Sequence, residues 1–398
     1  MIPAKTDPLA LLSRVKTLNI LFLGTIFFAS QAVSAAGLIK EPVFVRVLVA
    51  EDRTSMTLTA SEGVVLRVLP SGRVVKPRVK IESTRLASTV DGFRFGNEAF
   101  VGQTLVIEPI RDRELFLDET RFRGNITLRK SKNGLMYAVN RLDIESYLYG
   151  VLPHEVAPWW PMEALKSQAV AARTYAYYQT QVSRTHEYDV KSGTSSQMYG
   201  GSTTERFRSK RAVDHTEGQI LTYKGKVFPA YFHATCAGVT AGAKELWNID
   251  LPPIAGGVKC GYCRLSPHFY WQAKVPLSVL ESKLKQKEHP VGRVLKIEPV
   301  TQTPSGRVGS VRIKGTEQEA VIAAKDLRVL IGGDLMRSTD FTVEVKEDYA
   351  EFHGKGWGHG VGLCQWGALG QSLVGRSYKD ILSFYYPGSD ITSLRGTK

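Results

Sequence analysis

Residues 144–182 read IESYLYGVLPHEVAPWWPMEALKSQAVAARTYAYYQTQV, which contains two helical patterns separated by an aromatic segment. Residues 144–150 have the composition of a short helix. The longer pattern begins at Pro161, because proline fits the first helical turn, where its missing N–H costs nothing. No glycine or proline interrupts residues 162–182, and one face carries apolar side chains at helical spacing: Leu165, Ala169, Ala172 and Ala176. This pattern predicts a buried helix whose small residues permit close packing.

Glu155 is expected on a loop between these two helices, among apolar and aromatic residues that include Trp159 and Trp160. Such surroundings disfavour the charged carboxylate and raise its pKa. A glutamic acid that stays protonated near neutral pH can act as the general acid in glycosidic cleavage. The alternative is a capping or ion-paired glutamate, which is the more frequent case for an isolated glutamate in a sequence.

The part of the chain before this stretch is predicted to be a β-rich N-terminal module, residues 37–130. Short alternating runs such as residues 43–49 and 63–69 indicate strands separated by turns. The pattern continues across a turn at Lys132-Asn133-Gly134, which predicts a hairpin between residues 127–129 and 136–140.

The part after the long helix mixes strand and helix signals, and a last helix is expected at residues 378–385. Strand runs and a helix at 277–285 indicate an inserted subdomain at residues 270–350. The predicted fold class is therefore α+β, with a main domain over residues 131–393.

A glycine-rich stretch, FHGKGWGHGVGLCQWGA, occupies residues 352–368. Its glycines allow the backbone to approach a ligand closely, and His359 and Gln365 supply hydrogen-bonding groups. The stretch lacks the spacing and the Lys-Ser/Thr end of a phosphate-binding loop. A glycine-rich turn without a ligand is the alternative.

Two pairs at two-residue spacing, His233 with Cys236 and Cys260 with Cys263, could close a tetrahedral structural zinc site. This set leaves no open coordination position, which argues against a zinc hydrolase. A disulfide among the cysteines is the competing interpretation if the chain is exported. Cys364 is left over and is expected to be a small buried residue.

The first 36 residues have the features of a signal peptide. Arg14 and Lys16 precede an apolar stretch at residues 18–28, and the small residues Val33 and Ala35 precede a cut at Ala36. An uncleaved anchor is the alternative, but it needs about 20 apolar residues. We therefore expect export to the periplasm or cell envelope, with membrane contact only through this segment if it is not cleaved.

The chain is basic, with a formal net charge of +14. Removing the signal peptide lowers this to about +12, which implies a partner that carries negative charge. The basic residues form no clustered arm and no aromatic RNA-binding signature, so we expect no nucleic acid. With export, an anionic cell envelope is the better candidate; a merely soluble basic surface is the alternative.

Residues 140–393 resemble the catalytic domain of the stage II sporulation protein D (SpoIID) family, which also includes amidase enhancers of the LytB type. Three motifs carry the resemblance: residues 147–156, residues 163–176, and the Gly-His-Gly-Val-Gly run followed by Gln365. The resemblance implies a lytic transglycosylase. Such an enzyme cuts between N-acetylmuramic acid and N-acetylglucosamine in glycan strands from which a cell-wall amidase has removed the peptides, in sporulation, division or general wall remodelling.

The resemblance also implies the site residues. Glu155 occupies the catalytic position, and five residues are expected around the substrate: Arg173, Gln197, Tyr199, His359 and Gln365. One carboxylate suffices and no cofactor is required, because the C6 hydroxyl of the substrate attacks and leaves a 1,6-anhydro product. Hydrolysis would need a second acid; Asp143 and Glu163 are better explained as helix-terminus charges. The family commonly has Ser at Cys364 and Tyr at Trp366. A non-catalytic glycan-binding enhancer of an N-acetylmuramoyl-L-alanine amidase is the competing function.

Overall fold

A computed structural model describes residues 42–110, 114–183, 187–193 and 196–394. The predicted signal peptide, residues 1–36, lies outside these ranges. A run of ten strands precedes the first helix, and helices and strands are mixed in the rest of the described chain, so the predicted α+β class is confirmed. None of the helices in the described ranges combines the length and the apolar composition that crossing a membrane requires.

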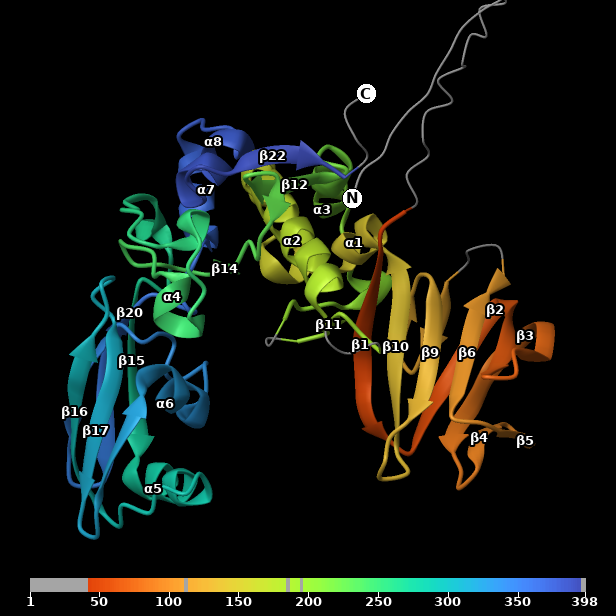
Figure 1. Cartoon of the computed structure of the whole chain (residues 1–398), viewed down its shortest axis with the longest axis horizontal. Helices are drawn as coiled ribbons and strands as arrows, with labels where there is room; N and C mark the ends of the chain where they lie inside the picture. Colours follow the sequence, from red (N-terminus) through yellow and green to blue (C-terminus); the bar gives the residue numbers. More distant parts are fainter. Residues whose placement is uncertain (1–41, 111–113, 184–186, 194–195, 395–398) are drawn as a thin grey trace, which may run out of the picture. The chain divides into compact units, whose positions relative to one another are not determined.

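The N-terminal half forms one large sheet with the strand order β11-β1-β10-β9-β6-β2-β3-β4-β5, and β7 joins β2 to β8 (Figure 1). All pairs are antiparallel except β1 with β11. The strands are β1 Phe44–Arg53, β2 Ser55–Leu69, β3 Arg73–Ser88, β4 Gly92–Phe95, β5 Glu98–Val101, β6 Thr104–Pro109, β7 Leu115–Leu117, β8 Thr120–Phe122, β9 Asn125–Lys130, β10 Met136–Asp143 and β11 Val190–Lys191.

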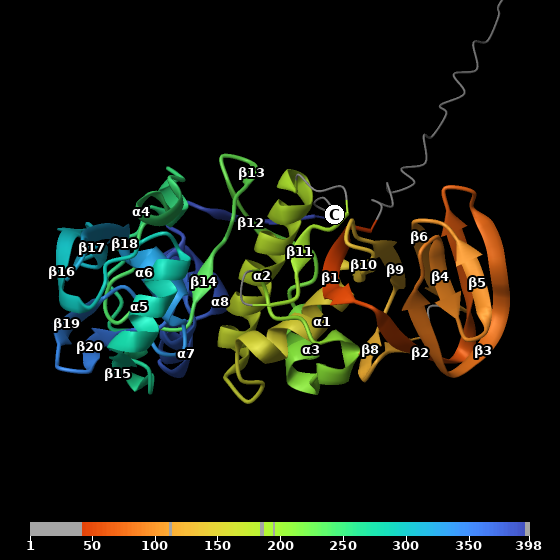
Figure 2. The ribbon, with the colours of Figure 1, turned by 90° about the horizontal axis from the view of Figure 1, so that it is seen from below.

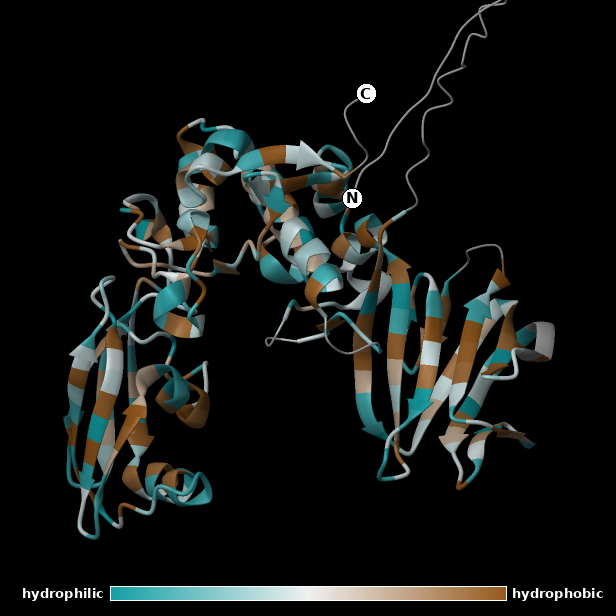
Figure 3. Ribbon diagram, viewed as in Figure 1, coloured by the Kyte–Doolittle hydropathy of each residue, from teal (hydrophilic) through white to brown (hydrophobic). Residues whose placement is uncertain are grey.

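The hairpin predicted around Gly134 is confirmed as β9 and β10. Half-buried and buried residues alternate over the first four residues of β9, and hydrophilic and hydrophobic bands follow one another along the strands of this sheet in Figure 3. Because β10 also pairs with β1, a single sheet extends across the predicted boundary between residues 130 and 131.

Helices α1 (Ile144–Glu155) and α2 (Met162–Val182) contact β10 and β1 (Figures 1 and 2). The Asp143 side chain caps α1 by accepting from the amides of Glu145 and Ser146. The predicted apolar face of α2 is fully buried, in one hydrophobic core with residues of the sheet and of α3 (Phe207–Asp214). Burial of this stripe, rather than helix propensity, stabilises so long a helix.

A second hydrophobic core joins α2 to the C-terminal part of the chain. β14 and β21 lie parallel, with Phe232 opposite Leu363 and His233 opposite Cys364. The elements around this core are β12 Gln219–Tyr223, β13 Lys226–Val227, β14 Phe232–His233, α4 Ala243–Trp247, β21 Leu363–Cys364, α7 Gln365–Leu373, α8 Tyr378–Tyr385 and β22 Asp390–Ser393. The β14–β21 pairing therefore brings segments about 130 residues apart into contact.

Residues 270–355 contain a third core of their own. It lies within two three-stranded sheets, β15-β20-β19 and β16-β17-β18, and two helices. The elements are β15 Tyr270–Pro276, α5 Leu277–Gln286, β16 Val294–Gln302, β17 Val308–Gly315, β18 Glu319–Ala323, α6 Ala324–Ile331, β19 Phe341–Val345 and β20 Tyr349–Lys355.

Candidate active site

Glu155 is the last residue of α1, and not part of a loop as the sequence suggested. Pro153 would be expected to end the helix, since it lacks an amide for the carbonyl of the preceding turn. The helix nevertheless continues, because the amide of Val156 bonds to the carbonyl of Leu152 at 3.1 Å. The carboxyl group is thereby fixed by the end of a buried helix.

The Glu155 carboxylate has two neutral donors, the Met198 amide to Oε1 at 3.2 Å and Gln365 Nε2 to Oε2 at 3.3 Å. Burial raises the pKa of Glu155 to about 7, and the two hydrogen bonds oppose this rise. The residue stays partly exposed. Near pH 7 it can therefore both give and accept a proton, which is the property that general acid–base catalysis requires.

The segment that carries the Met198 amide is held from both sides. Gln197 is buried, accepts from the Tyr147 hydroxyl at 2.9 Å and donates to the carbonyl of Ala172. Tyr199 is also buried and donates to Asn140 Oδ1 at 2.8 Å. Both were predicted to contact substrate, but their polar groups bond inside the protein. They position Met198, whose backbone amide contributes the contact.

Arg173 was also predicted to contact substrate, and here the structure corrects the sequence. Its side chain has no exposed surface, and its guanidinium bonds to the Glu145 carboxylate at 2.6 and 2.9 Å. The guanidinium nitrogens of Arg173 also donate to the carbonyls of Val213 and Gln219. Arg173 therefore links α2 to α1 and to the chain leading into β12, and offers no group to a ligand.

An aromatic cluster follows Glu155 in the chain. Trp159 is 71% exposed, whereas Trp160 is buried between Trp159 and Trp366, with ring centroids 6.4 and 5.3 Å away. Arg208 fixes this segment by donating to the carbonyls of Pro158 and Trp160 at 3.0 and 2.9 Å. The exposed indole of Trp159, on a backbone segment held by these bonds, offers a surface for stacking against a flat ligand.

Gln365 lies near the end of the glycine-rich stretch and is the first residue of α7. Its side chain reaches Glu155 from this position. Gly362 has φ +72°, and a Cβ there would lie 2.0 Å from the carbonyl oxygen of Tyr231, so only glycine fits. His359 is partly buried, its Nδ1 accepts from the amide of Val361, and burial holds its pKa well below the usual value. It is therefore neutral at pH 7, and the structure gives it no contact with Glu155.

Four cysteines converge in the second core: Cys236, Cys260, Cys263 and Cys364. Their sulfur atoms all lie within 4.8 Å of one another, each is buried, and none is in a disulfide. Three of them were predicted as zinc ligands. Cys364, which the sequence left over, belongs to this cluster, and His233 does not.

His233 lies outside the cysteine cluster because its Nδ1 bonds to the carbonyl of Val361 at 3.0 Å and its ring lies beside His359, 5.6 Å between centroids. The pairing of β14 with β21 explains the exchange, since it sets Cys364 opposite His233. The sequence signal that could have found it is the even number of cysteines, four in all.

The comparison with known proteins decides the family. Residues 132–223, which include Glu155, α2 and Met198, match the family model described as stage II sporulation protein (SpoIID). The chain is 30% identical over 271 residues to stage II sporulation protein D of Bacillus amyloliquefaciens, covering 64% of this chain and 76% of that protein. The chain belongs to the SpoIID family. The family resemblance of the sequence is thus confirmed.

Other relatives of this SpoIID-family chain are similar over a comparable stretch. It is 39% identical over 262 residues to an uncharacterized protein of Brachyspira hyodysenteriae, covering 65% of this chain and 69% of that protein. It is 28% identical over 294 residues to the amidase enhancer of Bacillus subtilis, covering 62% of this chain but 40% of that protein. Residues 262–362 match a domain of unknown function, DUF8618.

Proposed function

We propose that this SpoIID-family chain is a lytic transglycosylase that cleaves between N-acetylmuramic acid and N-acetylglucosamine in peptide-denuded glycan strands. The observation that carries the proposal is Glu155, a carboxylic acid with its pKa raised to about 7 and no cationic partner among its hydrogen-bond donors. Membership in the SpoIID family supports a role related to the cell wall.

In the first step the Glu155 carboxyl donates its proton to the glycosidic oxygen, and the bond from that oxygen to C1 of the muramyl sugar breaks. Positive charge develops on the ring. In the second step the Glu155 carboxylate takes the proton of the substrate's C6 hydroxyl while that oxygen bonds to C1. The acid is regenerated, no water is consumed, and a 1,6-anhydro end results.

The two donors to Glu155 serve both steps. Each carboxyl oxygen accepts one hydrogen bond and keeps a second lone-pair site for the travelling proton. A pKa near 7 keeps the protonated and ionised forms close in free energy, so neither proton transfer is strongly uphill.

The nearby acids in the sequence already have other partners, which favours one carboxylate over a two-acid hydrolysis. Asp143 caps α1. Glu163 bonds to Lys166 at 2.8 Å and accepts from the amide of Tyr378. A hydrolase would need a second acid free to activate water.

Trp159 extends the site toward the sugar. Its exposed indole, four residues after Glu155, offers the apolar face on which a pyranose ring stacks. We expect Trp159→Ala to weaken binding of glycan about tenfold.

The test is incubation of the full mature chain with purified denuded strands, followed by mass spectrometry of the ends. Anhydro ends that form with the parent support the proposal. Reducing ends that have gained water would show hydrolysis instead. Binding without any cleavage would favour the second candidate function, a glycan-binding enhancer of a cell-wall amidase, which the similarity to the Bacillus subtilis amidase enhancer supports. In either function we propose that the chain is exported to the periplasm or cell envelope and that an amidase acts upstream.

We also propose that the four cysteines hold a structural zinc ion. In a tetrahedral site with Zn–S bonds of about 2.3 Å, sulfur atoms lie about 3.8 Å apart; Cys236 and Cys263 Sγ are 3.6 Å apart. The buried Arg307 guanidinium donates to the carbonyl of Cys236 at 3.1 Å, where its charge offsets part of that of the thiolates. With four protein ligands the ion would stabilise the fold and take no part in the chemistry.

Elemental analysis of two variants tests the ligand set. We expect Cys364→Ser to lose zinc and thermal stability, and His233→Gln to keep its zinc. Retention of zinc by Cys364→Ser together with its loss from His233→Gln would restore the set suggested by the sequence. A metal-free parent with a mapped disulfide among these cysteines would contradict both.

A further inference from the structure

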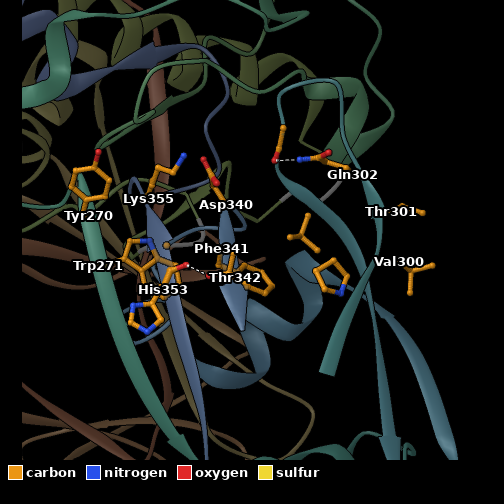
Figure 4. Close-up of a pocket in the computed structure, with 14 residues that line it drawn as sticks. Tyr270, Trp271, Val300, Thr301, Gln302, Asp340, Phe341, Thr342, His353 and Lys355 are labelled. Atoms are coloured by element: carbon orange, nitrogen blue, oxygen red, sulfur yellow. Dashed lines mark hydrogen bonds between the residues drawn. The ribbon is translucent and has the colours of Figure 1, made fainter. Parts of the chain in front are cut away.

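A groove in the region of residues 270–355 lies outside the elements that carry Glu155. It has a volume of about 740 Å³, within the range of small-molecule binding sites. Figure 4 shows the residues that define what we call the aromatic groove: Tyr270, Trp271, Gln302, Asp340, His353 and Lys355. They come from β15, β16, β20 and the residue before β19, so both three-stranded sheets contribute to it.

One buried side chain fixes the floor of the aromatic groove. Ser338 Oγ accepts from the indole Nε1 of Trp271 at 3.3 Å and from the amide of Asp340 at 3.2 Å, and donates to the carbonyl of Lys355 at 2.6 Å. Gly354 lets the Trp271 ring lie against β20, because a Cβ there would be 2.2 Å from the indole. The groove is thus held in shape before any ligand arrives, which limits the entropy lost on binding.

The side chains that face solvent in the aromatic groove are an exposed aromatic ring and polar groups that can still bind a ligand. The Tyr270 ring is 72% exposed, and its neighbour Phe269 packs against its side with centroids 5.0 Å apart. Within the described ranges, neither the Asp340 carboxylate nor the Lys355 ammonium forms an ion pair. Gln302 Nε2 bonds to the carbonyl of Gly306 at 2.9 Å, which leaves its oxygen as an acceptor (Figure 4).

This set of groups matches the chemistry of an amino sugar with an acid substituent. A pyranose ring has an apolar face for Tyr270 and hydroxyl groups that donate and accept, which suits a carboxylate and an amide oxygen. The free lactyl carboxylate, present once the stem peptide is removed, suits the Lys355 ammonium. We propose that the aromatic groove is a second binding site for peptide-denuded glycan, separate from Glu155; this rests on the proposed function.

The glycine-rich stretch, residues 352–368, begins in the groove, which it lines with His353 and Lys355. β20 ends at Lys355, and Gly356 and Trp357 continue directly toward His359 and Gln365. The amide of Trp357 bonds to the carbonyl of Thr235 at 2.9 Å, and that of Gly358 to the carbonyl of Arg337 at 2.9 Å, so this connection is ordered. Glycan bound in the groove would keep the enzyme on its strand between cleavage events.

The experiment uses the full mature chain with Glu155→Gln, so that glycan is not cut. Calorimetry measures the binding of a denuded tetrasaccharide with free lactyl groups. In parallel it measures the binding of chitotetraose, which has no carboxylate. We expect two tetrasaccharides bound per chain, one of them weakened about tenfold or more in Tyr270→Ala and the other about tenfold in Trp159→Ala. Lys355→Ala should weaken groove binding of the lactyl-bearing ligand about fivefold at low salt, less at high salt, and leave chitotetraose unaffected.

Two matched variants control for folding and net charge. Tyr349→Ala removes a tyrosine from β20 outside the groove, and Lys285→Ala removes an exposed lysine from α5. Both should bind as the parent does. The proposal is overturned if Tyr270→Ala keeps both sites, or if tighter binding through Tyr270 appears with strands that still carry stem peptides, which would make the peptide the occupant. If the Glu155→Gln chain binds one tetrasaccharide, and binding depends on Tyr270 but not on Trp159, the proposed function is contradicted while the groove stands.

Discussion

Glu145 and Glu155 lie near opposite ends of α1 and are both half-buried, yet their partners differ. Glu145 faces the guanidinium of Arg173 at 2.6 Å and accepts from the amide of Gly218. Glu155 receives two neutral donors and no cation. The guanidinium of Arg173 ties the first carboxylate into the structure, whereas the neutral donors leave the second able to change its protonation state. One helix thus carries one carboxylate that is paired with a cation and one that has only neutral donors.

The largest effect is expected from removing Glu155, the proposed general acid. Glu155→Gln keeps the shape of the side chain but cannot donate a carboxylic proton, so cleavage of denuded strands should fall at least about 10²-fold while the protein stays folded. The measurement is the rate of anhydro-end formation. Glu163→Gln serves as the control and should cleave within a few-fold of the parent. An unimpaired Glu155→Gln would move the acid elsewhere.

Breaking the structural pair should instead cost stability. Arg173→Met leaves the Glu145 carboxylate buried without its cation, and we expect a loss of about 3–5 kcal/mol in the free energy of unfolding, measured in urea. The control is Lys191→Met, which breaks the exposed pair with Glu51 and should cost less than about 1 kcal/mol. Equal losses in the two variants would remove the distinction between the two ends of α1.

The pH dependence of stability sharpens the comparison further. The pKa of Glu155 is raised from its usual 4.5 to about 7 by burial, so its contribution to stability is fully present below pH 4.5 and is lost as pH rises through 7. The free energy of unfolding of Glu155→Gln minus that of the parent should therefore increase from pH 5 to pH 8, by at most about 3 kcal/mol. Thermal unfolding at both pH values tests this. A constant difference would mean that Glu155 titrates alike in both states.

A smaller effect is expected at Gln365. Its hydrogen bond opposes the rise in the pKa of Glu155, so Gln365→Leu should raise that pKa further, by about one unit or less. Because the acid must be protonated, the alkaline fall in cleavage rate should move to higher pH. Gln272→Leu, which alters an exposed glutamine bonded to Glu351, should leave the profile in place. A shift to lower pH would contradict the assignment.

The local sequence was enough to predict the raised pKa of Glu155, but not the partners that distant segments supply. Aromatic and apolar neighbours within six residues predicted the raised pKa of Glu155, and the uninterrupted pattern of residues 162–182 predicted α2 with its buried face. The arginine on that helix was misassigned, since a sequence shows a cation but not whether Glu145 will meet it. Met198 was missed because it contributes a backbone amide, which any residue possesses.

The cysteine cluster shows the same limit. Spacing within each pair predicted three ligands, but Cys364 lies about 100 residues beyond Cys263 and reaches them through the β14–β21 pairing. Register between strands so far apart depends on the whole second core, and no short pattern reports it.

The way residues 270–355 leave and rejoin the rest of the chain bears on how such a protein could be assembled by evolution. Tyr270 pairs with Lys355 across β15 and β20, and just outside them the amide of Gly356 bonds to the carbonyl of Phe269 at 3.0 Å. The exit and the return are therefore adjacent, as at sites where whole segments are gained or lost without rethreading the chain. A shorter gene could close the gap between Phe269 and Gly356 with a tight turn, and keep the glycine-rich stretch, Gln365 and Glu155 in the same order.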